Sequence, residues 1–388
     1  MIVKIKDVCS AVYSGGTPNK KHPEYYDGGE IPWLNTGEIE FNRIYKTEKY
    51  ISDIGFNSSS AKWVPANAVI VAMYGATAAR TAITKIPLTT NQACCNLIID
   101  DAKADYRYVY YYLCSQYTQL ASLANGGAQQ NLNAGQVKDF DIDLPDMATQ
   151  RKVADLLTML DDKIEVNNEI NKNLEEQAQS IFAERFVNND YEIAKVTNLG
   201  SVCDCVLGGT PSRAKPEFWN GNIPWINSGE VNRFRITSPS ELITQAGLER
   251  SATKLLPAKT TVLAITGATL GQVSLLEIAA CANQSVVGIV PNTTLPYEFI
   301  YPYIRANIQE LISHQTGGAQ QHINKQNVEG LSISIPSKPL LDDFVSLVSP
   351  IYAMVASNCF ENVRLEQLRD SLLPQLMSGE LDVSNIDF

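Results

Sequence analysis

The sequence predicts an α+β protein in which two mixed α/β domains, related by a pseudo-twofold axis, are separated by two long antiparallel coiled-coil helices. Two observations lead to this prediction. The chain repeats itself after about 192 residues, and each copy ends in a long segment with a heptad pattern. A solenoid unit has a period of roughly 20–50 residues, so this repeat is a whole duplicated domain. The expected ranges are domains at 1–145 and 191–338, a central helix at 146–190, and a C-terminal helix with its tail at 339–388.

Short motifs recur in the same order in both copies. They are GGTP at 15–18 and 208–211, IPW at 31–33 and 223–225, N[ST]GE at 35–38 and 227–230, GAT at 75–77 and 267–269, NQ at 91–92 and 283–284, and GGAQQ at 126–130 and 317–321. A chain with such built-in pseudo-twofold symmetry suits a target that has two parts.

Composition is that of an ordinary globular protein, with 388 residues and 45% hydrophobic residues. No apolar run approaches the ~18 residues of a membrane span, and the start of the chain lacks a signal-peptide pattern, so the cytoplasm is expected. The eight cysteines and three histidines show no metal-ligand spacing, so no metal site is expected.

The net charge of −11 is unevenly distributed. The two repeated domains are nearly neutral, at −1 and +1, whereas the segments 146–190 and 339–388 carry −5 and −6. A neutral domain can still present a basic face to nucleic acid, because attraction of DNA depends on the local electrostatic potential and not on the net charge.

Within the first copy, the apolar runs 69–73 and 96–99 are typical of buried strands. The tyrosine-rich stretch 104–123 reads as one helix. We expect its tyrosines to pack in the core, with phenol groups at the rim, rather than to stack on bases.

A long helix follows each domain. Asp146 can cap the first, which continues without Pro or Gly to about Phe186. The residues at 3-4 spacing form an a/d seam in each copy: Leu157, Leu160, Ile164, Asn167, Asn171, Leu174, Ala178 and Ile181, then Val348, Ile351, Val355, Asn358, Asn362, Leu365, Arg369 and Leu372.

Two matched seams with central asparagines suggest that the helices pair with each other. An antiparallel pairing places Asn167 opposite Asn362 and Asn171 opposite Asn358. A parallel pairing also matches Asn with Asn, but the pseudo-twofold symmetry and the intervening domain favour the antiparallel one. Buried Asn pairs penalise slipped registers, in which Asn would face Leu.

Catalytic motifs are missing from the sequence. It lacks a GxxxxGK[ST] phosphate loop, HExxH, GxSxG, a deaminase HxE with PCxxC, and the Asn/Asp-Pro-Pro-Tyr of an amino-methyltransferase. This pattern indicates a chain that positions something for another subunit.

The ordered, duplicated motifs, together with the C-terminal LRDSLLPQLMSGEL at 368–381, resemble the specificity subunit of Type I restriction–modification systems over essentially the full length. The resemblance implies a non-catalytic subunit with two target-recognition domains, each reading one half of a bipartite double-stranded DNA site. It also implies that the helices set the unread spacer and dock two adenine-methylating modification subunits, which bind S-adenosylmethionine. An ATP-driven restriction subunit, which uses Mg, joins for cleavage, and the specificity subunit itself has no cofactor. The first helix begins Ala148-Thr149-Gln150-Arg151 instead of with the acidic start common in the family, so a changed helix start is expected.

Basic residues at equivalent repeat positions are the candidates for DNA contact, as phosphate or guanine ligands. The alternative for each is a solvated surface charge. Arg80 and Gln272 are also candidates, because they occupy equivalent positions but differ, as base readers would. The candidates are Lys20, Lys21, Arg43, Lys62, Arg80, Arg213, Lys215, Arg235, Lys254 and Gln272.

Two other classes of function compete with the DNA-specificity scaffold. One is a structural or ligand-binding protein with two domains on a rigid spacer, which sequence-specific DNA capture in the presence of modification subunits would exclude. The other is a self-contained methyltransferase, which the missing motifs disfavour and which cofactor binding by the isolated chain would revive.

Overall fold

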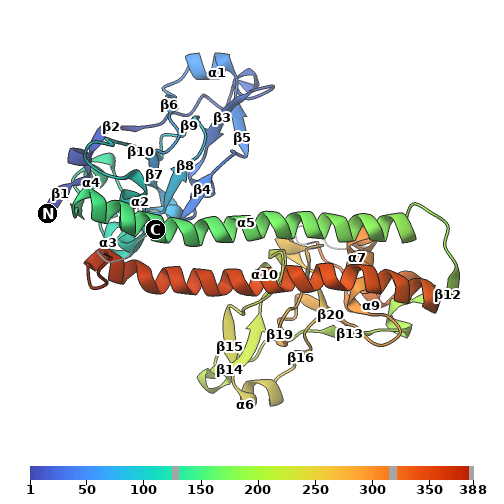
Figure 1. Cartoon of the computed structure of the whole chain (residues 1–388). Coiled ribbons are helices and arrows are strands. Elements are labelled where there is room, and N and C mark those ends of the chain that lie inside the picture. The colour runs from blue at the N-terminus through green and yellow to red at the C-terminus, as the bar shows by residue number, and fades with distance from the viewer. Residues whose placement is uncertain (125–130, 314–320, 384–388) are drawn as a thin grey trace. The chain divides into compact units, whose positions relative to one another are not determined.

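Each of the two long segments forms one continuous helix in the computed structural model, which describes residues 1–124, 131–313 and 321–383. These helices are α5, Met147–Phe186, and α10, Lys338–Ser378. The chain divides into two compact units: unit 1 comprises Met1–Asp162 with Glu366–Phe388, and unit 2 comprises Lys163–Leu365. Both helices therefore contribute to both units (Figure 1). The GGAQQ motifs fall, except for Gln321, outside the described residues.

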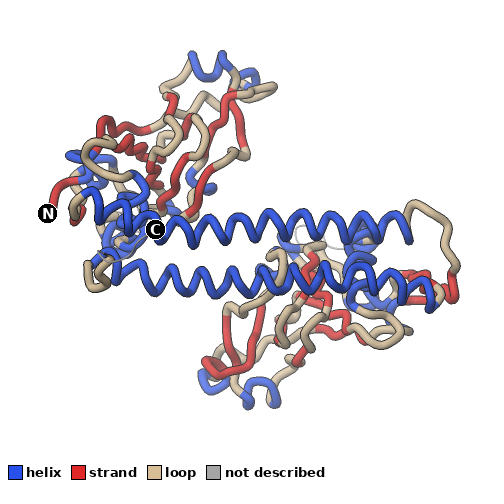
Figure 2. The backbone as a smooth tube through the Cα atoms, in the orientation of Figure 1, coloured by secondary structure: helices blue, strands red, loops and turns tan. Residues whose placement is uncertain are grey.

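Unit 1 contains strands joined by loops and short helices before α5 begins (Figure 2). Its described residues form a ribbon, β1-β11, and two sheets with strand orders β2-β10-β7-β8-β4 and β5-β3-β9-β6. The strands are β1 Ile2–Lys4, β2 Cys9–Ser14, β3 Ile31–Leu34, β4 Asn42–Ile44, β5 Lys49–Ile51, β6 Trp63–Val64, β7 Val69–Ala72, β8 Thr81–Thr84, β9 Leu88–Thr90, β10 Cys94–Ile99 and β11 Asp141–Asp143, and the helices are α1 Asp53–Asn57, α2 Tyr106–Ser115, α3 Tyr117–Ser122 and α4 Ala134–Lys138.

Unit 2 has a similar arrangement in its described residues, with a ribbon β12-β21 and sheets ordered β13-β20-β17-β18 and β15-β14-β19-β16. The counterpart of β4 is reduced to a single parallel bridge between Ile236 and Leu276. The strands are β12 Ile193–Asn198, β13 Asp204–Leu207, β14 Trp219–Ile226, β15 Glu241–Ile243, β16 Leu255–Leu256, β17 Thr261–Ala264, β18 Val273–Leu275, β19 Ala280–Ala282, β20 Val286–Val290 and β21 Ser332–Pro336, and the helices are α6 Gln245–Glu249, α7 Tyr297–Ala306, α8 Ile308–Ser313 and α9 Lys325–Glu329. The duplication seen in the sequence is thus a duplication of fold.

The core of each unit includes residues from both long helices. In unit 1, Leu157 of α5 and Leu376 of α10 are buried with the sheet and helix residues that form the core. In unit 2, the ring of Phe182 on α5 lies 5.7 Å from that of Phe299 and 6.0 Å from that of Phe344 on α10. Burial of apolar surface drives this packing, so each domain rests against its own stretch of the helices.

The stretch predicted as one helix over 104–123 is two helices, α2 and α3, with Gln116 between them. The break lies at Gln116, whose backbone φ of −96° and ψ of 14° depart from the helical values. The tyrosines pack as expected: Tyr108 is buried and donates its hydroxyl to the Asp143 carbonyl at 3.0 Å, while Tyr111 donates to Asp161 at 2.6 Å.

In unit 2, α5 and α10 pair antiparallel (Figure 1). The Asn167 amide donates to Asn362 Oδ1 at 2.8 Å, and the Asn358 amide donates to Asn171 Oδ1 at 2.9 Å. In unit 1 the same pairing continues with Arg369, whose guanidinium lies 2.8 Å from Asp161. The α5 start is also as expected, because Asp146 accepts from the Thr149 backbone N–H at 2.9 Å.

The absence of an apolar run of membrane-spanning length was expected, but α10 is, among the described residues, one helix long and apolar enough to cross a membrane. Length and composition alone are weak evidence of a span, because a core helix passes the same test. Phe344 and Val348 of α10 are buried in the unit 2 core, Val355 is also buried, and Asn358 bonds to α5. Packing thus accounts for part of its apolar content.

Candidate nucleic-acid interface

The repeated GGTP and IPW motifs contact each other in both domains. The Trp33 indole N–H donates to the Gly16 carbonyl at 2.9 Å, and the Trp225 indole donates to the Gly209 carbonyl at 3.1 Å. A Cβ on Gly16 would lie 2.3 Å from the Ala61 backbone nitrogen, so a side chain does not fit at this position. These motifs therefore build the domain, and their recurrence reflects structure.

The N[ST]GE motif also has a structural role. The Asn35 N–H donates to Glu38 Oε1 at 3.0 Å, and the Asn227 N–H donates to Glu230 Oε2 at 3.0 Å. The second oxygen of Glu38 accepts from the Glu48 N–H at 2.8 Å. Each glutamate thus closes one turn and holds a second segment, so the carboxylate is occupied by backbone groups.

Six of the predicted DNA-contact residues are exposed. Lys20 and Lys21 follow the first GGTP turn, and Lys215 follows the second. Lys62 and Lys254 come directly before the edge strands β6 and β16, at equivalent repeat positions, and Gln272 precedes β18. The Lys62 ammonium lies 5.7 Å from the centroid of the Tyr13 ring, a distance at which the two attract.

Two predicted residues are tied to carboxylates at the surface. Arg80 lies 3.1 Å from Glu40. Arg213 makes a two-pronged pair with Glu241, with one bond of 2.7 Å, and stacks 3.6 Å from the Trp219 ring centroid. The hydrogen bond from Arg213 lowers the pKa of Glu241, so the carboxylate is ionised at neutral pH. Arg213 is consequently occupied within the domain.

Arg43 and Arg235 are corrections to the predicted set, because the structure encloses both side chains. The Arg235 side chain is 1% exposed and the Arg43 side chain is 7% exposed. Arg235 lies 2.6 Å from Glu175 of α5, and Arg43 pairs with Asp162 of α5. A guanidinium held in this way cannot reach a phosphate or a base edge, so the equivalence of the two arginines reflects a shared internal contact.

Trp63 and Leu255 were missed by sequence reasoning. They are 46% and 49% exposed, follow Lys62 and Lys254, and occupy equivalent edge strands. The match at the repeat offset was available in the sequence, but an apolar residue in a strand is usually a core residue. Each edge strand thus presents a cation next to an exposed apolar side chain.

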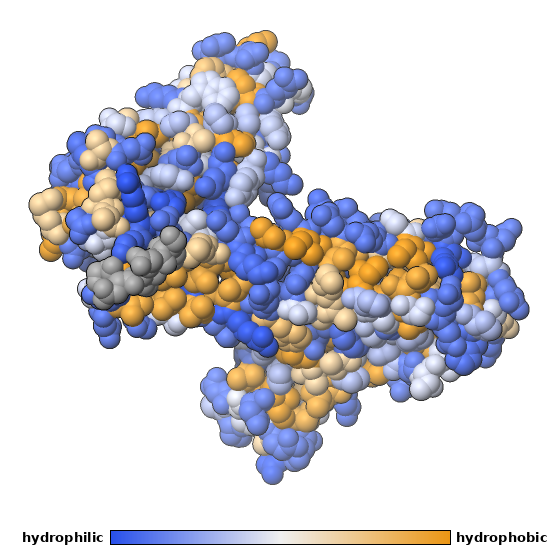
Figure 3. Space-filling model, viewed as in Figure 1, coloured by the Kyte–Doolittle hydropathy of each residue, from blue (hydrophilic) through white to orange (hydrophobic). Residues whose placement is uncertain are grey.

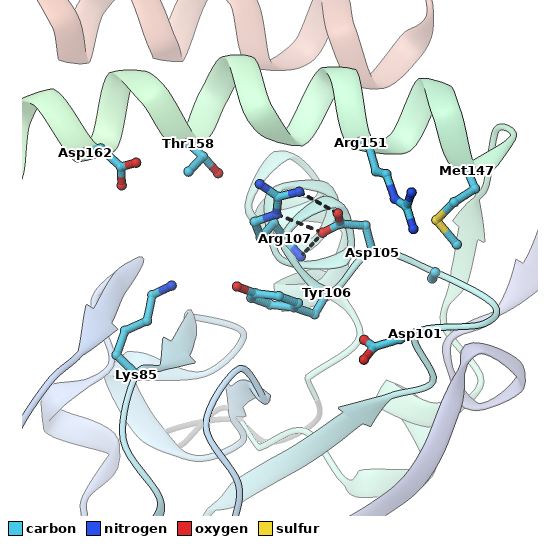
Figure 4. A pocket seen from close by; sticks show the side chains of 10 residues that line it. Lys85, Asp101, Asp105, Tyr106, Arg107, Met147, Arg151, Thr158 and Asp162 are labelled. Atoms are coloured by element: carbon cyan, nitrogen blue, oxygen red, sulfur yellow. Dashed lines mark hydrogen bonds and ion pairs between the residues drawn. The ribbon is translucent and has the colours of Figure 1, made fainter. Parts of the chain in front are cut away.

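A cavity of about 490 Å³ lies in unit 1 beside α5 (Figure 4). Arg107 there pairs with Asp105 at 2.7 Å and Asp155 at 2.6 Å, and the Lys85 ammonium lies 5.8 Å from the Tyr106 ring centroid. The repeat counterparts of Lys85 and Arg107 are Glu277 and Glu298. Because these charges are reversed, the cavity is not a feature that both domains use.

Candidate metal ligands do not cluster in the described ranges, where groups of three or more His, Cys, Asp or Glu side chains suited to an ion do not occur. The four asparagines at the centre of the helix seams, in contrast, lie together as described above.

The model of the Type I restriction modification DNA specificity domain matches residues 1–176 and 191–340 of the chain. The Type I restriction enzyme MjaIX specificity subunit of Methanocaldococcus jannaschii is 27% identical, over 99% of this chain and 94% of that protein. The HindI specificity subunit of Haemophilus influenzae is 24% identical, over 69% of this chain and 74% of that protein.

The fold is similar to that of a solved structure, the Type I restriction–modification S subunit from M. genitalium. The TM-score is 0.60 at 16% identity, over 97% of this chain and 95% of that chain. The likeness extends to two specificity domains and long helices, as the sequence predicted. The chain belongs to the family of Type I restriction–modification DNA specificity domains, and it is a non-catalytic DNA specificity subunit.

Proposed function

We propose that the domain at 1–145 and the domain at 191–338 each read one half of a bipartite DNA site. The observation that supports this most is the duplication of fold, with the same motif contacts at Trp33 and Trp225. Two equivalent readers in one chain fit a target with two parts. The stretch between the half-sites is then spacer DNA.

The exposed cations are the proposed contacts with DNA. Lys62 and Lys254, each next to an exposed apolar side chain, are equivalent in the two domains and would position phosphates. Lys20, Lys21 and Lys215 would add to this contact beside the GGTP turns. Arg80 and Gln272 remain proposed base readers, because the two domains differ at this position.

The helices α5 and α10 are the proposed ruler and docking surface. Forty residues of α5 at ~1.5 Å each give a rod of roughly 60 Å, longer than the ~34 Å of one DNA turn. The register between α5 and α10 is held by the asparagine pairs at 167/362 and 171/358. In unit 2 the helices also expose Val166, Ile170, Leu347 and Met354, and Figure 3 shows hydrophobic atoms over the helices.

Exposed apolar residues on acidic helices fit contact with protein partners. We propose that two modification subunits dock there and that an ATP-driven restriction subunit joins them. S-adenosylmethionine, ATP and Mg then belong to those partners. The cytoplasm, where the host DNA lies, is the proposed location.

Exchange of residues 1–145 for the first domain of a relative tests the proposal. The expected result is a new base sequence in one half-site, with the other half-site and the spacer unchanged. The measurement is a map of methylated adenines made with the chain and its modification subunits. A change in both half-sites at once would contradict independent reading by the two domains.

A further inference from the structure

A buried charge network joins the second recognition domain to α5. Glu175 of α5 is 5% exposed and accepts from Arg235 at 2.6 Å and from Arg305 of α7 at 2.6 Å. The Arg235 guanidinium also donates to the Tyr301 hydroxyl at 3.0 Å and lies 3.6 Å from Glu277. One helix carboxylate is thus held by two arginines that come from different parts of the domain.

Burial by itself lowers the pKa of the Arg235 guanidinium, but Tyr301 and Glu175 outweigh it and raise that pKa, so the side chain stays charged. Moving the Arg235 guanidinium away from Glu175 is strongly destabilising, because it leaves a buried ion without its partner.

The first domain makes the corresponding contact with the equivalent arginine. Arg43 on β4 pairs with Asp162 of α5, and its second terminal nitrogen lies 3.5 Å from the Thr158 carbonyl. Arg107 on α2 and Tyr111 add bonds to Asp155 and Asp161 of the same helix, at 2.6 Å each. Each domain therefore meets α5 through directional polar bonds in addition to its apolar core.

We propose that Arg43 and Arg235 are positioning residues that fix the register of each recognition domain on the helix α5, and thereby select the length of the DNA spacer. The inference rests on the proposed function, in which the helices set the spacer. Apolar packing alone is weakly directional, since a helix presents similar apolar side chains at successive turns. A charge pair singles out one position along the helix, because a shift by one turn separates the ions.

The proposal assigns different roles to the lysines and the arginines that recur at equivalent positions in the two domains. The exposed lysines would govern how tightly DNA is held, and the enclosed arginines would govern how far apart the two half-sites lie. Each added base pair moves and turns one half-site, so a firmly held domain discriminates between spacers and a loosened one accepts neighbours.

Glu175→Gln tests the proposal in the assembled complex with modification subunits. The probe is a set of duplexes that carry both wild-type half-sites with the spacer lengthened or shortened by single base pairs. The expected result is that the preference for the wild-type spacer falls by about tenfold, while half-site sequence preference stays the same. Gln keeps the shape of the side chain and Glu277 still faces Arg235, so the variant should fold.

The matched control is Glu176→Gln, which removes the same charge from the next position of α5. Its partner is the exposed Lys172, at 3.9 Å, so the spacer preference should stay at the wild-type value. Asp162→Asn provides the independent variant in the first domain, because its side chain is 56% exposed and its loss threatens folding less.

Spacer preferences of Glu175→Gln and Asp162→Asn equal to that of Glu176→Gln would overturn the inference, even if the melting temperature fell, because the pairs would then be only structural. A wild-type complex that distinguishes neither half-sites nor spacers would instead contradict the proposed function itself.

Discussion

At the scale of single residues, burial raises the pKa of every cysteine thiol, to about 12 for Cys95 and to about 11 for Cys359. All eight cysteines lie in the described ranges and are free. A raised thiol pKa means that less thiolate, the reactive form, is present at a given pH. At pH 8 the folded chain should react with a disulfide reagent about a hundredfold more slowly than free cysteine.

The measurement is the time course of thionitrobenzoate release by folded and by guanidinium-unfolded protein. The unfolded chain should react rapidly at all eight positions. Rapid reaction of a thiol in the folded chain would show that a buried cysteine is reached by solvent.

Lys254 provides a residue-scale test of the DNA surface. Lys254→Ala should weaken binding by a similar factor for all DNA sequences and reduce the slope of log K against log salt by about one, as a lost phosphate contact does. Lys338→Ala, which removes an exposed lysine at the start of α10, is the control. Fluorescence anisotropy over a range of salt concentrations measures both, and an unchanged slope for Lys254→Ala would remove it from the interface.

Residues at matched positions of the repeats could be found from the sequence, but their exposure could not. Arg43 and Lys62 each have a basic counterpart, yet one is enclosed against α5 and the other is exposed. The acids that enclose Arg43 and Arg235, at positions 162 and 175, are distant in sequence, and acidic residues on a helix ordinarily face solvent. Tertiary contact decides between the two environments, and a single sequence does not encode it locally.

At the scale of elements, the helices were predictable where the pattern is long. The a/d seam predicted α5, which ends at Phe186 as expected, whereas the short helices α2 and α3 were predicted as one. A forty-residue pattern is long enough to indicate one continuous helix, but the shorter stretch 104–123 gives no signal for the break at Gln116.

The asparagine pair between α5 and α10 provides an element-scale prediction. Asn167→Leu removes the donor to the buried Asn362 oxygen, so the free energy of unfolding should fall by about 1–3 kcal/mol. Asn167→Leu combined with Asn362→Leu should recover most of this loss, because neither polar group is then left buried without a partner. Urea unfolding of the four proteins in the cycle measures the coupling. Additive losses would contradict a direct interaction.

Lengthening both helices tests the proposal that α5 and α10 set the length of the DNA spacer. Four residues inserted after Asp162 and four after Leu365 leave the internal contacts of both units in place, because these positions are the boundaries between them. The added turn rises ~6 Å and rotates by roughly 40°, close to the rise and rotation of one to two base pairs. The methylated sites should keep both half-site sequences and gain that many base pairs of spacer. An unchanged spacer would show that α5 does not set it.

At the scale of the whole molecule, the chain is built to place partners and carries no chemistry of its own. Its repeated glycines, tryptophans and glutamates make internal contacts in the two domains, as at Gly16, Trp33 and Glu38. Under the proposed function, the exposed cations and the two long helices are what the chain offers to DNA and to partner subunits. DNA methylation should then depend on the binding of modification subunits, and the number of subunits bound per chain can be measured.

The purified chain alone should therefore neither methylate nor cleave DNA, because it lacks a phosphate loop and the amino-methyltransferase motif. Addition of modification subunits should restore methylation, with activity rising until two subunits are bound per chain, since each of the two similar units would dock one subunit under the proposed function. Transfer of labelled methyl groups to DNA, followed alongside native mass measurement, tests both statements. Methyl transfer by the contaminant-free chain would contradict the first, and full activity at one modification subunit per chain would contradict the second. The duplication of fold makes the second outcome the more informative. A single bound subunit reaches only one half of a two-part site, so half-modified DNA at low subunit ratios is the direct consequence of a duplicated reader.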